Sequence, residues 1–161
     1  MRELAKRSRA EGRVYLTGGA SSVLLDWRDM TVDVDIKIIP ESYALHTAIR
    51  DLKEQLNINV EPASPADFIP ELPGWQERSR FIVREGKLDF YHYDFYAQCL
   101  SKIERGHEKD DADVRNMIKS GLVEKSRLLA LFEQVEPELV RYYAIDAADF
   151  RRAVESTIAG A

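Results

Sequence analysis

Hydrophobic and polar residues alternate strictly over residues 32–38, which read Val-Asp-Val-Asp-Ile-Lys-Ile. Successive side chains of a β-strand point to opposite faces of the sheet, so this pattern predicts a half-buried strand. The polar face of that strand carries Asp33 and Asp35, two residues apart and pointing the same way. The pattern therefore predicts a strand that presents two neighbouring carboxylates on its exposed face.

Strands and helices are predicted to alternate as far as residue 93. The segment 13–17 is rich in β-branched and aromatic residues and is followed by two glycines, which favours a strand that ends there. Apolar residues at helical spacing favour helices, and Pro40 suits a first helical turn. The predicted helices are 2–11, 20–27 and 40–56, with a brief helical turn after residue 64. The further strands are 58–60, 80–84 and 87–93, with a loop at 70–74 and a hairpin turn at 85–86.

From residue 94 onward the pattern is helical. Helices are expected at 94–105, 110–119, 124–134, 137–143 and 147–158. Gly121 is a predicted C-cap, and Asp146 with Asp149 a predicted N-terminal cap pair. The whole order predicts an α+β fold, in which a mixed β-sheet with flanking helices is followed by a C-terminal helical segment. We expect residues 1–93 to form a cleft-bearing core and residues 94–161 to pack on it as one compact unit.

The composition narrows the classes of function. The chain has 161 residues, of which 45% are hydrophobic and 32% charged, as in a globular domain with a real core. Its net charge of −5 excludes nucleic-acid binding by overall charge, so an anionic substrate would need a local basic patch or metal ions. Cys99 is the only cysteine, which excludes a disulfide framework and favours the cytoplasm. No segment reads as a signal peptide or reaches the roughly 18 apolar residues of a membrane span, so no membrane partner is expected.

The candidate chemistry lies where the strand 13–17 gives way to a helix. Gly18 and Gly19 would let the backbone approach a phosphate closely, and Ser21 could add a hydroxyl donor. Asp33 and Asp35 could together grip divalent cations that bridge a triphosphate. Each part alone is common, but the order of the parts and the spacing between them point jointly to a nucleotide site.

Two stretches of the chain carry a resemblance to a known family. Residues 16–21 (Leu-Thr-Gly-Gly-Ala-Ser), followed by residues 31–36 (Thr-Val-Asp-Val-Asp-Ile), resemble the glycine-glycine/serine and Asp-x-Asp pattern of the nucleotidyltransferase superfamily, which has the DNA polymerase β-like fold. Residues 94–114 resemble the Ser-Lys…Arg…Asp-x-x-Asp segment of small bacterial nucleotidyltransferase-like proteins, relatives of the abortive-infection nucleotidyltransferase toxins. With the tail from residue 137, the resemblance covers most of the chain.

The resemblance implies a Mg²⁺-dependent transfer of NMP from an NTP to a hydroxyl acceptor on RNA or protein. It implies two Mg²⁺ ions, with Mn²⁺ as a substitute, and a toxin–antitoxin setting with a cognate antitoxin as partner. Asp33 and Asp35 would be the metal ligands, and Lys102 would contact a phosphate. Asp110 or Asp113 would complete the site or orient Lys102 and Arg105. The nucleotide-binding residues would be Gly18, Gly19, Ser21, Ser22, Lys102 and Arg105.

Several alternatives stay open at this point. A third carboxylate is common in the superfamily, and Asp89 or Asp94 could supply it. The carboxylates at the start of the 110–119 helix could equally be ordinary caps and ion pairs. A basic cluster of Arg78, Arg80, Arg84 and Lys87 could line an RNA groove, but interspersed acids favour a mixed surface; His92 reads as a plain strand histidine and Cys99 as core. The protein could also be a non-catalytic nucleotide-binding or partner-binding module of the same fold, or an interaction protein with a decayed cleft.

Overall fold

The computed structural model describes residues 1–160 and divides the chain into two compact units. The sheet unit contains Met1–Ser64 and Ser79–Tyr93, and the helical unit contains Pro65–Arg78 and the described residues from Asp94 on. Residues 65–78 thus group with the helices and not with the strands that flank them in sequence. The chain passes from the sheet unit to the helical unit after Tyr93, which coincides with the expected boundary between residues 93 and 94. The expected division into domains 1–93 and 94–161 stays a prediction.

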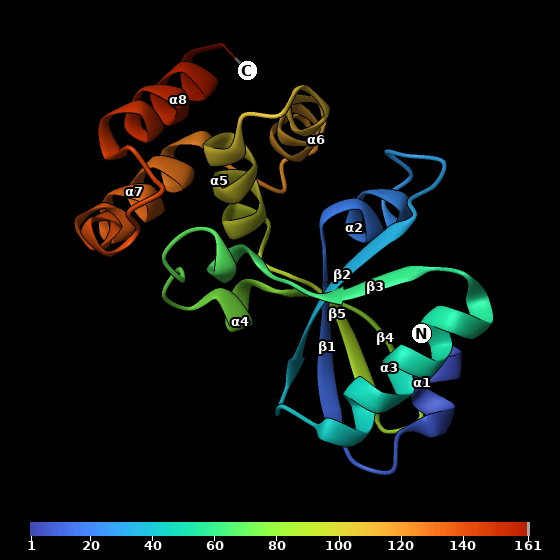
Figure 1. Ribbon diagram of the computed structural model, residues 1–161. Coiled ribbons are helices and arrows are strands. Elements are labelled where there is room, and N and C mark those ends of the chain that lie inside the picture. Colours follow the sequence, from blue (N-terminus) through green and yellow to red (C-terminus); the bar gives the residue numbers. More distant parts are fainter. Residues whose placement is uncertain (161) are drawn as a thin grey trace. The chain divides into compact units, whose positions relative to one another are not determined.

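The sheet unit is built on a five-stranded mixed sheet in the order β3-β2-β1-β5-β4 (Figure 1). β1 pairs antiparallel with β2 and parallel with β5, β2 pairs parallel with β3, and β4 pairs antiparallel with β5. The predicted α+β class with a mixed sheet is confirmed. The strands are β1 (Gly12–Thr17), β2 (Asp33–Ile39), β3 (Asn59–Pro62), β4 (Arg80–Glu85) and β5 (Leu88–His92).

Three helices belong to the sheet unit, and α1 and α3 pack on one face of the sheet (Figure 1). That face is the apolar side predicted for 32–38, since Ile36 and Ile38 are 4% and 2% exposed. The expected helix 40–56 begins later than predicted, because the hydroxyl of Ser42 caps it by accepting from the Leu45 N–H at 3.4 Å. The helices are α1 (Arg2–Arg7), α2 (Gly18–Leu24) and α3 (Tyr43–Leu56).

The helical unit is organised around α5, which contacts α6, α7 and α8. Asp146 accepts a hydrogen bond from the Asp149 N–H at 2.9 Å, as the predicted cap pair requires, and Gly121 follows the C-cap of α6 with φ +74°. The pattern missed α4 and predicted an α-helix where the 3₁₀ helix η2 lies. Among residues 1–160 no helix is long and apolar enough to cross a bilayer. The elements are η1 (Pro65–Asp67), α4 (Trp75–Arg78), α5 (Phe95–Arg105), α6 (Glu108–Lys119), α7 (Lys125–Val135), η2 (Glu136–Arg141) and α8 (Ala147–Gly160).

Candidate active site

The bend between β1 and α2 lies directly against the carboxylate of Asp35. The β1–β2 register pairs Thr17 with Asp35, which brings the end of β1 beside this side chain. Gly18 has φ +60°, and a Cβ atom added there would lie 2.8 Å from Asp35 Oδ2. A Cβ on Gly19 would lie 2.5 Å from Thr31 Oγ1. Both positions therefore need glycine, and the paired glycines and Asp35 form one surface of the sheet unit, as their sequence order suggested.

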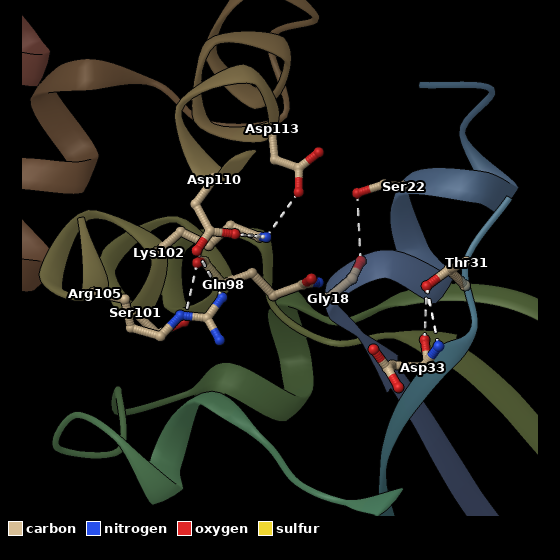
Figure 2. A network of polar contacts seen from close by, with 10 residues as sticks. All are labelled: Gly18, Ser22, Thr31, Asp33, Gln98, Ser101, Lys102, Arg105, Asp110 and Asp113. Carbon is tan, nitrogen blue, oxygen red and sulfur yellow. Dashed lines mark hydrogen bonds and ion pairs between the residues drawn. The ribbon is translucent and has the colours of Figure 1, made fainter. Parts of the chain in front are cut away.

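Asp33 is the first residue of β2, two positions before Asp35, and its side chain lies on the same face. The Asn59 side-chain amide donates to Asp33 Oδ1 at 3.0 Å. The Thr31 hydroxyl donates to the Asp33 carbonyl at 2.9 Å and accepts from the Asp33 N–H at 3.3 Å (Figure 2). These contacts orient the exposed start of β2 and its carboxylate.

A carboxylate that the sequence reasoning missed lies beside this pair, on β3. The parallel β2–β3 register pairs Asp33 with Asn59 and Asp35 with Glu61. Because paired residues of neighbouring strands share a face, Glu61 joins the two aspartates there. The Asn59 amide also donates to Glu61 Oε1 at 2.9 Å and so links Asp33 with Glu61. The available signal was the polar alternation of Asn59 and Glu61 with Ile58 and Val60, which repeats the pattern of β2.

Asp89, one of the two carboxylates considered for the third position, does not lie beside Asp35. Asp89 pairs with Arg13 on β1, four positions before Thr17, which places it roughly 13 Å along the strand from the Asp35 row. Its side chain is 3.5 Å from Arg84. The geometry gives the catalytic role assigned to Asp89 no support.

Asp94 belongs to the helical unit, where it caps α5. Its carboxylate accepts from the Tyr96 N–H at 3.2 Å and from Arg78 Nε and Nη2 at 3.0 and 2.7 Å. Burial raises the pKa of Asp94 although the hydrogen bonds from Arg78 act against it. The structure thus gives Asp94 a capping and ion-pairing role within α4 and α5.

The two serines of α2 direct their hydroxyls to the protein interior. Ser21 is 1% exposed and its hydroxyl donates to the Leu16 carbonyl at 3.0 Å. The Ser22 hydroxyl donates to the Gly18 carbonyl at 3.3 Å (Figure 2). Both contacts stabilise the bend itself; the phosphate contacts expected of Ser21 and Ser22 stay predictions.

His92 packs against the same bend from β5. Its Nδ1 lies 3.0 Å from the Ser21 hydroxyl oxygen, and because that hydroxyl donates to Leu16, the contact suits the tautomer that carries a proton on Nδ1. Burial, with the charge of Arg80 second, lowers the pKa of His92 to about 4. The imidazole is therefore neutral at neutral pH and buttresses the glycine bend as a hydrogen-bond donor.

The second predicted group of residues forms a buried ion network between α5 and α6 in the helical unit (Figure 2). Lys102 Nζ lies 2.7 Å from Asp110 Oδ1 and 2.7 Å from Asp113 Oδ2. Arg105 Nη2 lies 2.9 Å from Asp110 Oδ2. The side chains of Lys102, Asp110 and Asp113 are 4%, 3% and 2% exposed. The network joins α5 to α6, so Asp110 and Asp113 are more than ordinary capping residues at the start of α6.

Two cations and two carboxylates balance within this network. Burial alone would raise the pKa of Asp110, but the hydrogen bond from Lys102 and the charges of Lys102 and Arg105 outweigh it and hold that pKa below its ordinary value. Asp110 is therefore well matched to stay ionised, and it orients Lys102 together with Asp113. A contact between Lys102 and a phosphate stays a prediction. Nearby Cys99 is fully buried and its pKa is raised to about 12, which confirms that it is a core thiol.

The basic residues near the hairpin belong to different units, and several of them are paired. Arg78 lies in α4 of the helical unit and pairs with Asp94. Arg84 lies 3.5 and 3.6 Å from Asp89 and Glu11, and Lys87 donates to the Arg9 carbonyl at 2.9 Å. These neutralising contacts favour the interpretation as a mixed surface.

Residues 1–155 match the model of a protein family described as Nucleotidyltransferase of unknown function (DUF6036). The match spans both the glycine bend with its carboxylates and the Lys102 network. Neither the curated proteins nor the solved structures gave a match. The family description names the same broad activity as the resemblance carried by residues 16–21 and 31–36.

Proposed function

The chain belongs to this family of nucleotidyltransferases, and from that premise we propose that it moves an NMP from an NTP to a hydroxyl acceptor with Mg²⁺ as cofactor. The observation that carries the proposal is the approach of Gly18 to Asp35, where a Cβ on the glycine would lie 2.8 Å from Oδ2. Bare backbone beside a carboxylate suits a phosphate chain that contacts the protein on one side and a cation on the other.

The residues present fit a magnesium ion. Mg²⁺ prefers oxygen ligands and is usually held by one or two carboxylates together with substrate phosphates and water. Asp33 and Asp35 would hold it, with Glu61 alongside. Within residues 1–160 no group of three or more His, Cys, Asp or Glu side chains is placed to hold a metal ion. The bound ion would supply charge neutralisation on the triphosphate.

The chain's own groups have distinct roles in the proposed reaction. The acceptor oxygen attacks the α-phosphorus, the bond to the bridging oxygen breaks, and pyrophosphate leaves. Glu61 takes the proton of the acceptor hydroxyl as general base. Asn59 orients Asp33 and Glu61 through its two amide hydrogen bonds. The glycine bend is stabilised by the hydroxyls of Ser21 and Ser22, which donate to backbone carbonyls, and by His92, which contacts the Ser21 hydroxyl.

The finer parts of the proposal rest on the sequence resemblance. They are an acceptor on RNA or protein, a bacterial cytoplasmic setting and a cognate antitoxin as partner. In the helical unit, the buried pairing of Lys102 with two aspartates supports a positioning role that holds α5 on α6. The phosphate contact implied for Lys102 would require it to leave carboxylates 2.7 Å away.

The test is incubation of the purified protein with each α-labelled NTP, Mg²⁺, and either total RNA or cell extract. Label should enter an acceptor with wild type and with Asp51→Asn, an exposed carboxylate of α3, but not with Asp35→Asn. If no nucleotide labels any acceptor, or if Asp35→Asn labels as wild type does, the proposal is wrong. Stabilisation by Mg²⁺–NTP without turnover would instead favour the non-catalytic module.

A further inference from the structure

The start of β2 extends beyond the end of β1. The β1–β2 register pairs Thr17 with Asp35, so continuing it by two residues on each strand would place Gly19 opposite Asp33. The chain has already turned into a helix there, because α2 begins at Gly18. Gly19 thus belongs to α2 and not to the ladder, although Asp33 is still a residue of β2.

The Thr31 hydroxyl takes the place that a β1 residue would fill beside Asp33. The Val32 carbonyl accepts from the Asn59 N–H of β3 at 3.0 Å. Successive residues of a strand direct their backbone groups to alternate sides, so those of Asp33 point away from β3, toward the β1 side. Thr31 Oγ1 donates to the Asp33 carbonyl at 2.9 Å and accepts from the Asp33 N–H at 3.3 Å (Figure 2). One hydroxyl thus meets both backbone groups, as an opposite residue of an antiparallel strand does.

The same hydroxyl lies against the glycine bend. A Cβ atom added to Gly19 would lie 2.5 Å from Thr31 Oγ1 and 3.1 Å from Thr31 Cβ. The absence of a side chain at Gly19 therefore leaves the space that the Thr31 side chain occupies. Thr31 connects the glycine bend with the first residue of β2.

The segment that carries Asp33 lies at the surface. Asp33 is exposed and the side chain of Val32 beside it is 67% exposed, so packing anchors this segment weakly. The Asn59 amide, 3.0 Å from Asp33 Oδ1, holds the side chain, and the Thr31 hydroxyl holds the backbone. The direction of the Asp33 carboxylate depends on both contacts.

We propose that Thr31 is a positioning residue for the metal, because its hydroxyl fixes the backbone of Asp33 so that the carboxylates of Asp33 and Asp35 meet the same divalent cation. This inference rests on the proposed function, which takes the two aspartates as the metal ligands. Groups that orient metal ligands typically contribute about 10- to 100-fold to metal affinity. The hydroxyl acts on cation binding more than on the stability of the fold, because the segment that it holds is exposed.

The test measures binding of Mn²⁺ alone to the whole chain by electron paramagnetic resonance, with Asp33→Asn identifying the ion bound at this site. Thr31→Val replaces the hydroxyl with a methyl group of similar size and should weaken that binding about tenfold. Thr31→Ser keeps the hydroxyl and should bind as wild type does. Thr157→Val is the matched control: the Thr157 hydroxyl also donates to a backbone carbonyl, that of Ala153 at 2.8 Å, but lies in α8.

The outcomes separate this inference from the proposed function. Wild type without any Asp33-dependent Mn²⁺ binding overturns both the metal site and the role of Thr31. If wild type binds the ion and Thr31→Val binds it equally, or if Thr31→Ser binds it as weakly as Thr31→Val, only the role of Thr31 is wrong. Should Thr31→Val fail to fold, Gly19→Ala takes its place in this comparison, because its Cβ would displace the same hydroxyl.

Transfer assays give a second readout. Thr31→Val should raise the Mg²⁺ concentration that gives half of the maximal rate and leave the rate at saturating Mg²⁺ unchanged. A lower maximal rate with an unchanged Mg²⁺ requirement would overturn the role of Thr31 in cation binding.

Discussion

The carboxylate of Asp35 lies so close to Gly18 that a Cβ on the glycine would be 2.8 Å from Oδ2. The two residues are 17 positions apart in sequence (35 − 18) and meet through the register of β1 with β2. The contact joins the two motifs on which the proposed chemistry depends. A substitution that adds a Cβ at Gly18 therefore tests the proposed chemistry.

Gly18→Ala should displace the Asp35 carboxylate and remove nucleotidyl transfer. An alanine in this left-handed conformation costs about 1–2 kcal/mol of stability, and its Cβ would displace the Asp35 carboxylate. Gly106→Ala is the matched control, because Gly106 has φ +61° and a Cβ there meets nothing within 4 Å. Urea denaturation and transfer assays should show similar losses of stability but loss of activity only for Gly18→Ala. Equal activity of the two variants would contradict the role of the contact.

Glu61→Gln should lower transfer about 10²-fold or more while the protein stays folded, because the amide cannot take the acceptor proton. Asp89→Asn should have little effect, since Asp89 lies roughly 13 Å along the sheet from the Asp35 row. Single-turnover rates of both variants at saturating NTP make the comparison. The opposite ranking would restore Asp89 as the third carboxylate and remove Glu61.

Lys102→Met should destabilise the protein by about 3–5 kcal/mol, because it removes the ammonium that buried Asp110 and Asp113 share and leaves Asp110 with Arg105 alone. Lys119 lies at an exposed position of α6, outside the network, and Lys119→Met should change stability by less than about 0.5 kcal/mol. Chemical denaturation at neutral pH measures both. A stable Lys102→Met protein that has lost transfer would instead show that Lys102 contacts the substrate.

Acidification should weaken the protein through His92. Its pKa is lowered from 6.5 to about 4 in the folded state, so the contribution of the neutral imidazole is fully present above pH 6.5. Between pH 6.5 and 4 the unfolded chain binds the extra proton, and stability falls by roughly 3 kcal/mol. His92→Gln should flatten this part of the pH–stability profile from urea titrations, whereas His107→Gln, at an exposed position, should preserve it. An unchanged slope in His92→Gln would argue against a buried neutral histidine.

Local patterns in the chain were enough to predict most elements of the fold. The alternation over 32–38 identified β2 and its two aspartates, and the helical spacing after residue 94 identified α5, α6, α7 and α8. The helix boundaries were less accurate, because caps such as Ser42 override the average preferences of a segment. The short α4 was missed, because four residues between a glycine and a strand carry too little periodicity.

The amino-acid order alone was enough to predict the nucleotidyltransferase family, since paired glycines, the Asp-x-Asp strand and the Lys102 segment are all visible in it. The partners of these residues depended on chain folding. Strand register placed Glu61 beside Asp35 and moved Asp89 away, and packing of α2 turned the Ser21 hydroxyl toward Leu16 and His92. The reason is that periodicity reports which face of an element is buried, whereas the neighbour across that face is chosen by strand pairing and packing between residues distant in sequence.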